Sequence, residues 1–549
     1  MIMKNYFAKS SVALMVVSAA LASCTQDEIV QNNVPTRQAL NISVNTQDFV
    51  SEDGSRATTS TDAGRATAFV EGDEMGMYVI SSDGTVICNN EKFVYEGSAW
   101  KAANELYYWK NADYIVYYPY DESLTVESIL DVDDTASSEE TDPSEEMTIV
   151  DALKAKFAGT ENFYTQNTAE AYEKADLMLA EVNSPANGTI QFNLAHQFSM
   201  VEINVPVRRY KTTEAQGNFE YTAPVSLTWN TDLKIGDNVV APYSTGKGSF
   251  RFIVPSATDL FLTLDGCLMY DEGVPVYFGS STEPQSINLA SGLCKVYNVT
   301  YSEVENTVDT RDLEVGDYYY SDGSIYPYGN QEGDNDKSKP VKDGCIGVIF
   351  EVGTGVPNTP WTHGSVLALH DSNGENGIDA WCKWGTAANT IAANIIADIT
   401  TPESKTELIN KKNGYAMSYS EELGSVEAIS KAKAYTVEVP GDNVTSGWYL
   451  PAMGQLLDVV AKLGGVTVSN TDNMTTRGTY SAAIAKISEA LVKVDGRATD
   501  GSGAYRWWST TEKGTDHVYT LVVNEGAVGD RTKYNSTGNE NYARPVLSF

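Results

Sequence analysis

The chain of 549 residues is poor in histidine, with four, and in cysteine, with six, and no two cysteines stand in a CxxC spacing. Zinc centres and thioredoxin-like redox sites therefore have little support, because both depend on such paired ligands. Basic residues are also scarce: 38 Lys and Arg stand against 74 Asp and Glu, for a formal net charge of −36. Nucleic-acid binding needs a basic surface that displaces counterions, so this balance argues against it.

The cysteines leave disulfide pairing open. Cys24 belongs to the N-terminal segment discussed below, and the other five are Cys88, Cys267, Cys294, Cys345 and Cys382. An odd number leaves at least one thiol unpaired within a single chain. Bridges between Cys267 and Cys294 and between Cys345 and Cys382 stay possible.

What the chain does contain is typical of β-rich globular protein. Its length allows about three domains of about 150 residues, and a 42% hydrophobic content with 32 tyrosines provides for buried cores. The negative charge is concentrated in residues 121–146, where eleven Asp and Glu stand without one Lys or Arg. Such a run predicts a solvated insertion rather than a cation or partner site.

The N-terminus has the features of an export signal. Lys4 and Lys9 precede an apolar run over 12–21 that is too short to span a bilayer but suits a signal-peptide core over residues 1–23. The run ends in Leu-Ala-Ser-Cys at 21–24, which resembles a bacterial lipobox and implies lipidation of Cys24 and a place in the outer membrane at the cell surface. An ordinary secretory signal with an incidental cysteine is the alternative.

Residues 24–63 are expected to form a lipidated linker or prosegment, rich in Thr, Ser, Asn and Asp. Strand patterns follow it. Met75, Met77 and Val79 alternate along one strand, and aromatic or β-branched runs occupy 109–120, 192–205, 250–255 and 293–301. In this order the motifs resemble the fimbrillin family of Bacteroidetes pilus subunits over about residues 38–305.

The fimbrillin resemblance implies two transthyretin-like β-sandwiches, expected over 64–205, with the insertion at 121–146, and over 206–305. It also implies proteolysis after an arginine and assembly by strand donation to other pilus subunits, because a sandwich that lacks an edge strand leaves unpaired backbone groups beside an apolar groove. Arg56 and Arg65, each followed by alanine, match such a cleavage position, and solvated linker residues are the alternative. His196 lies in a strand pattern and is expected to be structural.

A different domain is expected over 306–549. The chain has Leu-Glu-Val-Gly-Asp-Tyr-Tyr at 313–319, Gly-Trp-Tyr-Leu-Pro at 447–451, Arg-Trp-Trp-Ser at 506–509 and Ala-Arg-Pro-Val at 543–546. Together these resemble the bacterial C-type-lectin-like domains, an α+β fold, so the whole chain is predicted to be mainly β. Apolar spacing predicts helices over 401–412, with a possible extension back to 387, after Pro451 and over 479–494. Trp448, Trp507 and Ser509 are expected to be scaffold.

Ligand contacts are expected on the long polar segment between the last two strands, because loops on a rigid scaffold commonly carry binding. Amide, guanidinium and aromatic groups suit a glycan or protein ligand. The predicted contacts are Arg531, Tyr534, Asn535, Asn539, Asn541 and Trp384. A polar loop without a ligand is the alternative, and Trp361 and Trp381 stay open as contacts or core.

No cofactor or metal is predicted. The oxygen-rich stretches 332–336 and 371–377 lack the spacing and terminal glutamate of an EF-hand loop, although calcium is not excluded there. The formylglycine-generating enzymes of the lectin-like class use reactive cysteines near the C-terminus, and no cysteine follows Cys382 here. No nucleophile elbow is recognisable either.

The sequence therefore predicts a protein that is not an enzyme. It is interpreted as a lipoprotein-derived pilus subunit that acts as a tip adhesin, with a non-polymerising outer-membrane lipoprotein that captures glycans and a structural stalk subunit as the alternatives.

Overall fold

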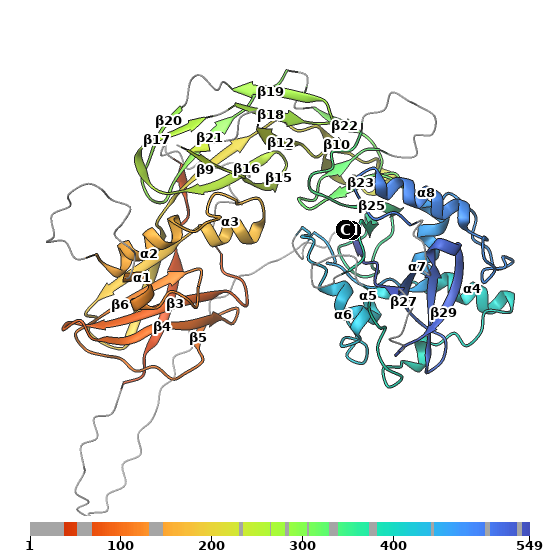
Figure 1. Cartoon of the computed structure of the whole chain (residues 1–549), viewed down its shortest axis with the longest axis horizontal. Helices are drawn as coiled ribbons and strands as arrows, with labels where there is room; N and C mark the ends of the chain where they lie inside the picture. Colours follow the sequence, from red (N-terminus) through yellow and green to blue (C-terminus); the bar gives the residue numbers. More distant parts are fainter. Residues whose placement is uncertain are drawn as a thin grey trace, which may run out of the picture.

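A computed structural model describes residues 38–51, 68–130, 147–229, 234–235, 237–263, 265–279, 285–302, 304, 307–328, 339–372, 381–440, 444–499, 505–534 and 541–549. The predicted lipidation site Cys24, the cleavage sites Arg56 and Arg65, and the contacts Asn535 and Asn539 lie outside these ranges, as do 332–336 and 373–377. Figure 1 shows three parts in an arch: the N-terminal and C-terminal parts form its two ends, and a middle part joins them at the top.

The N-terminal part is built on one seven-stranded sheet in the order β1-β8-β7-β6-β3-β4-β5. Its two edges approach each other, because Leu40 N donates to Leu106 O at 2.9 Å and Tyr108 N to Gln38 O at 2.8 Å. The sheet encloses a core that includes Met77, Tyr114 and Phe192. Its strands are β1 (Asn41–Thr46), β3 (Glu74–Ser81), β4 (Val86–Tyr95), β5 (Trp100–Ala102), β6 (Ala112–Tyr118), β7 (Met178–Asn183) and β8 (Thr189–His196).

Three helices, which the sequence reading missed, cover the other face of this sheet: α1 (Val126–Leu130), α2 (Ile149–Ala158) and α3 (Ala169–Ala175). The start of the acidic stretch is part of this layer. Leu124, Val126 and Ile129 are buried in the core that α1 and α2 share with the sheet. The expectation of a solvated insertion is therefore wrong for 121–130, where apolar residues spaced among the acids seat α1; residues 131–146 lie outside the described part.

Residues 38–51, expected to be linker, are instead structured. β1 pairs in parallel with β8, and Ile42 and Val44 on its inner face pack against the core. The chain then reaches β2 (Val50–Ser51), which pairs in parallel with β21 of the middle part. Between the two strands the Phe49 ring stacks on His196, with centroids 3.7 Å apart. Residues 38–51 thus lie along both the N-terminal and the middle part. The alternation of polar and apolar residues over 41–46 is the sequence pattern that indicates the strand.

The middle part contains sheets in the orders β15-β16-β9-β21-β2, β14-β13-β17-β20 and β12-β18-β19. Its first long strand is β9, which begins at Ser199, so this part starts before the expected boundary at 206 because β9 pairs with β16 and β21 rather than with β8. Its strands are β9 (Ser199–Asn204), β12 (Ser226–Trp229), β13 (Lys234–Ile235), β14 (Asn238–Val239), β15 (Tyr243–Gly246), β16 (Ser249–Val254), β17 (Ala257–Thr263), β18 (Asp265–Met269), β19 (Pro275–Gly279), β20 (Gln285–Leu289) and β21 (Leu293–Asn298).

The C-terminal part combines two small sheets with five helices. The sheets have the orders β24-β23-β25-β26-β31 and β29-β28-β27-β30. The strands are β23 (Tyr318–Tyr320), β24 (Ile325–Tyr326), β25 (Cys345–Val352), β26 (Gly364–Ala368), β27 (Arg506–Glu512), β28 (His517–Val522), β29 (Ala527–Thr532), β30 (Asn541–Tyr542) and β31 (Val546–Ser548). The helices are α4 (Pro402–Asn410), α5 (Gly414–Ser418), α6 (Glu427–Lys433), α7 (Met453–Asp458) and α8 (Ser481–Val492).

The predicted helices are present as α4, α7 and α8, and α7 continues as a π-helix over Val459–Leu463. Thr401 caps α4 by accepting from Ser404 N, with Pro402 in the first turn, as the sequence signals indicate. The suggested extension back to 387 is wrong: only Ala392–Asn394 form a 3₁₀ turn, because Asn394 and Ile396 bond to β27 instead. The five cysteines in the described residues are free thiols, so neither suggested disulfide forms.

A joint connects the middle and C-terminal parts. Strands β10 (Arg209–Lys211), β11 (Glu220–Thr222) and β22 (Val308–Thr310) form a small sheet across it. Arg311 on this joint donates to both carboxylate oxygens of Asp317, each at 2.8 Å, and to the Tyr221 hydroxyl at 3.1 Å. Tyr210 of β10, Tyr221 of β11 and Leu313 share one apolar cluster with Phe549. The two parts are therefore held together by strand pairing and side-chain packing.

The joint is expected to weaken in acid. The His363 ring stacks on Phe219 with centroids 4.0 Å apart, and burial lowers the pKa of His363 below its usual 6.5. When folding lowers the pKa of a histidine, protonation of its ring favours the unfolded state. The free energy of unfolding therefore falls as the pH drops below the pKa that the histidine has in the unfolded chain. The free energy of unfolding, from urea titrations at about pH 7 and about pH 5, should fall less in His363→Phe than in the parent chain. An equal fall in both would contradict this role.

Candidate functional site

The described predicted contacts Arg531, Tyr534 and Asn541 stand at the two ends of the segment 533–541 between β29 and β30, which we call the terminal loop; its residues 535–540 lie outside the described part. The segment 381–385 fixes both of its ends. Gly385 N donates to Lys533 O at 2.9 Å, and Cys382 N donates to Asn541 O at 3.0 Å. Trp381 forms a further bridge to Tyr542. The loop therefore leaves the sheet from two anchored points.

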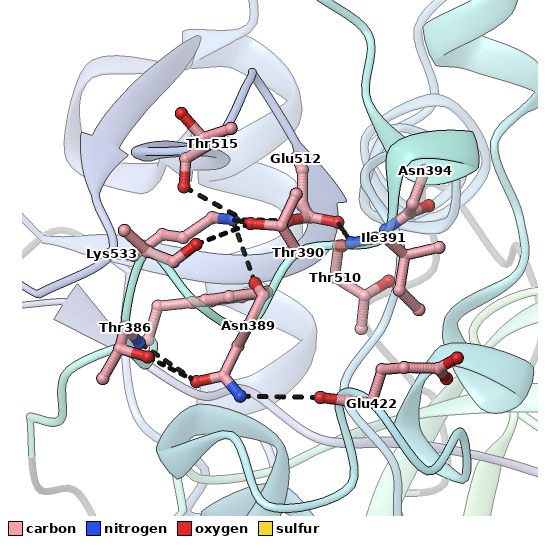
Figure 2. A network of polar contacts seen from close by, with 12 residues as sticks. Thr386, Asn389, Thr390, Ile391, Asn394, Glu422, Thr510, Glu512, Thr515 and Lys533 are labelled. Atoms are coloured by element: carbon pink, nitrogen blue, oxygen red, sulfur yellow. Dashed lines mark hydrogen bonds and ion pairs between the residues drawn. The ribbon is translucent and has the colours of Figure 1, made fainter.

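A buried ion pair forms the base of the terminal loop. The side chains of Lys533 and Glu512 are completely buried, and the Lys533 ammonium donates to Glu512 Oε1. It also donates to Asn389 O at 3.1 Å and to Thr390 Oγ1 at 2.8 Å, so all three ammonium protons have an acceptor (Figure 2). The second carboxylate oxygen of Glu512 accepts from Ile391 N at 3.0 Å. Both charges are thus paired and hydrogen-bonded, which burial requires.

The segment 386–396 is fixed to the same base. Asn389 Oδ1 accepts from Thr386 N at 3.3 Å and from Thr386 Oγ1 at 2.8 Å, while Asn394 Nδ2 donates to Thr510 O at 2.6 Å (Figure 2). Ile396 N also donates to Glu512 O at 2.9 Å. These hydrogen bonds fix the segment to β27, although its regular structure is limited to the 3₁₀ turn Ala392–Asn394. The sequence offered no signal for Lys533 and Glu512, which look like ordinary surface residues.

Trp384, predicted as a ligand contact, is a core residue instead. Its side chain is fully buried and its indole Nε1 donates to Ser509 O at 2.8 Å. The ring lies 4.9 Å from the Lys533 ammonium, so it forms part of the base of the terminal loop. The next residue, Gly385, packs closely against Val426, because a Cβ there would lie 3.2 Å from Val426 Cγ1. A buried indole offers no face to a ligand.

The remaining predicted contacts divide by exposure. Asn541 is only 4% exposed and belongs to β30, so it anchors the loop rather than facing outward. Arg531 lies half-buried on β29, where its Nη1 donates to Asp530 O at 2.9 Å. Tyr534 is 54% exposed, and Trp381, at the other anchor of the loop, is 56% exposed. Two exposed aromatic rings therefore stand at the described ends of the terminal loop: Tyr534 near its start, and Trp381 beside Tyr542, which follows its end.

The closing motifs are scaffold, as predicted for Trp448, Trp507 and Ser509, which are all buried. Arg544 adds a second buried ion pair: its Nε donates to Asp371 Oδ1 at 2.8 Å and its Nη2 to the Tyr505 hydroxyl at 2.8 Å. The other oxygen of Asp371 accepts from Arg497 Nη1 at 2.6 Å. Asp371, the first residue of one oxygen-rich stretch, is therefore engaged with two arginines.

The described residues contain no group of three or more His, Cys, Asp or Glu side chains placed to hold a metal ion. Across the same ranges, the helices are too short or too polar for any of them to cross a membrane.

Comparison with known proteins finds a family similarity over most of the N-terminal and middle parts. Residues 55–317 match the fimbrillin-like family. A Bacteroides ovatus protein to which the name fimbrium tip subunit Fim1C has been assigned is 24% identical over 583 aligned positions, which cover 96% of each chain.

Solved structures of fimbrial proteins are similar as well. A fimbrial protein from Bacteroides ovatus matches 94% of this chain and all of its own, with 21% identity and a TM-score of 0.37. The tip fimbrial protein Mfa3 from Porphyromonas gingivalis matches 42% of this chain and 91% of its own, with 8% identity and a TM-score of 0.22.

Proposed function

We propose that this chain, whose residues 55–317 match the fimbrillin-like family, is a fimbrial subunit which ends the fibre as a tip adhesin. The name of its Bacteroides ovatus relative, a fimbrium tip subunit, supports this place in the fibre. The N-terminal and middle parts would serve assembly with other pilus subunits. The C-terminal part would serve recognition of a glycan or protein ligand, and its likeness to C-type-lectin-like domains remains a prediction.

Strand β1 is suited to be exchanged for a strand from a neighbouring subunit. Its ladder partner is β8, while residues 38–40 before it bond to residues 106–108, and its inner residues Ile42 and Val44 are half-buried rather than fully enclosed. Cleavage after Arg56 or Arg65 would separate residues 38–51 from the body of the chain. Loss of this segment would leave the edge of β8 unpaired beside an apolar core, which is the acceptor that strand addition requires.

β31, in contrast, is part of a sheet of its own domain, and the tip assignment rests on this observation. β31 pairs with β26, and Tyr449 N donates to Val546 O at 2.9 Å on its other side. Phe549 is 2% exposed and lies 4.6 Å from the Tyr319 ring. Donating β31 to another subunit would require the C-terminal part to open. A subunit that accepts a strand and keeps β31 within its own domain fits the end of a fibre.

We place the ligand face at the terminal loop, with Tyr534 and Trp381 on either side. Exposed aromatic faces stack on the apolar side of a sugar ring, and the buried Lys533–Glu512 pair keeps the loop ends in position. Arg531 and the loop asparagines Asn535 and Asn539 would add hydrogen bonds. A single sugar site is weak, with a Kd of about millimolar to micromolar. Display on many fibres would raise the avidity.

Replacement of Tyr534 tests this face. Tyr534→Ala should leave the free energy of unfolding within about 0.5 kcal/mol of the parent, because the ring is half exposed, but should weaken binding on a glycan array about tenfold. Both measurements use the whole mature chain. Tyr277→Ala, which removes a 63% exposed ring from the middle part, is the matched control. Equal array signals for both variants would count against the terminal loop as the ligand face.

The anchor of the precursor is part of the same proposal. A lipid on Cys24 would hold the chain at the outer membrane before cleavage, and release of the segment that ends at Arg56 or Arg65 would detach the mature subunit from it. The cell surface and the fibre are then successive locations of one protein.

A further inference from the structure

A second recessed site lies on the C-terminal part, apart from the terminal loop. It is a pocket of about 230 Å³ between the face of β28 and β29, the start of α4 and the segment 473–475. Charged side chains of both signs line it: Asp398, Lys405, Lys513 and Asp530. Typical sites for drug-sized ligands measure about 300–1,000 Å³. This pocket therefore suits one small ring.

The charges in the pocket balance. Lys513 Nζ lies 2.7 Å from Asp530 Oδ2, so that pair is closed. Lys405 Nζ donates to Asp472 O at 2.7 Å, which uses one of its three protons. Asp398 Oδ2 accepts from Thr400 Oγ1 at 3.3 Å. An anion would meet two carboxylates and a cation would meet two ammonium groups. The pocket therefore favours a neutral ligand.

The lining is rich in both donors and acceptors. Ammonium groups only donate and carboxylates only accept, while a hydroxyl does both. Thr400, Thr475 and Asn473 add further polar groups beside the charged ones. A ligand that meets this set needs several groups able to donate and accept in different directions. Sugar hydroxyls have this property.

Tyr519 adds an independent observation. Its side chain, on β28, is 1% exposed and lines the pocket, and its hydroxyl has no hydrogen-bond partner among the described residues. Buried polar groups are nearly always hydrogen-bonded, so an unpaired hydroxyl beside a cavity needs an explanation. A ligand oxygen that enters the pocket would supply the missing partner.

We propose that this pocket binds a single neutral sugar residue, such as the end of a glycan chain. The proposal rests on the adhesive function proposed above and adds to it a second site, for one neutral sugar residue. Location at the fibre tip and exchange of β1 do not depend on it, so either idea can fail alone.

The test is calorimetry and saturation-transfer NMR on the whole mature chain with glucose, galactose, mannose, fucose and N-acetylglucosamine at up to about 50 mM. At least one should bind, and Tyr519→Phe should weaken it about tenfold. Asp398→Asn should do the same, while Tyr277→Phe should have no effect. Glucosamine and glucuronic acid should bind less tightly than their neutral counterparts.

The thermal stability of Tyr519→Phe distinguishes a role of the Tyr519 hydroxyl in binding from a role in the fold. Because the Tyr519 hydroxyl has no partner, Tyr519→Phe should keep the thermal midpoint of the parent or raise it. A lowered midpoint, or binding of the sugar unchanged in Tyr519→Phe, would overturn the proposal. So would failure of all five neutral sugars to bind, or tighter binding of a charged sugar. Loss of sugar binding in Tyr534→Ala but not in Tyr519→Phe would move the site to the terminal loop and leave the adhesive function standing.

Discussion

Locking β1 onto β8 is expected to abolish incorporation of the chain into fibres, and unlocking it to restore incorporation. Asn45 and Asn193 are register partners on these strands, both exposed, with Nδ2 and Oδ1 3.2 Å apart. Adjacent strands lie about 4.8 Å apart, within the Cα range of about 4.4–6.8 Å that a disulfide spans. Cysteines at both positions should therefore bridge the strands without changing the core face.

The effect should be all-or-none, because an acceptor groove that stays filled cannot take a donated strand. The measurement is the amount of the variant in purified fibres, with and without reductant in the assembly step. Asn45→Cys alone is the control, since it carries one new thiol and no bridge. Equal incorporation of the oxidised double variant and this control would show that β1 is not the strand exchanged.

The second large effect is expected at the base of the terminal loop. Lys533→Met should lower the free energy of unfolding by about 3–5 kcal/mol, because it leaves the Glu512 carboxylate buried and unpaired. Chemical denaturation followed by tryptophan fluorescence measures this loss. Lys174→Met breaks the Lys174–Glu170 pair, whose side chains are 68% and 72% exposed, and should cost at most about 1 kcal/mol.

A double variant without either charge shows whether the unpaired carboxylate or the lost side-chain packing causes the destabilisation. Lys533→Met combined with Glu512→Leu should be less destabilised than Lys533→Met alone, because no uncompensated charge remains. If the single and double variants were equally unstable, packing rather than charge would account for the role of Lys533.

Sequence patterns predicted the scaffold well where apolar periodicity and capping agree. The apolar spacing after Pro451 and over 479–494 gave α7 and α8, and Trp507 and Trp448 are buried as their motifs indicate. The mainly β class also holds, because alternation around Met75–Val79 corresponds to β3. Short helices such as α1 were missed, since acidic residues hide the spacing of Val126 and Ile129.

The site itself was less predictable. Exposure of Tyr534 follows from its polar surroundings, but burial of Trp384 depends on Lys533 and Ser509, which are 149 and 125 residues away in sequence. Long-range pairing of this kind leaves no local pattern. The same holds for the pocket at Tyr519, whose lining comes from α4, the segment 473–475 and the sheet. The strand over 41–46 was readable from its alternation, but the many Thr, Ser and Asn residues around it favoured a linker interpretation.

Immunogold labelling of intact cells with an antibody raised against the C-terminal part tests the central claim most directly. A subunit that accepts a strand through β8 while β31 stays buried in its own domain should appear once per fibre, at the tip. Gold particles along the shafts would instead indicate a stalk subunit, and a diffuse pattern over the outer membrane would indicate a lipoprotein that does not polymerise. Either of these two patterns would contradict the tip assignment.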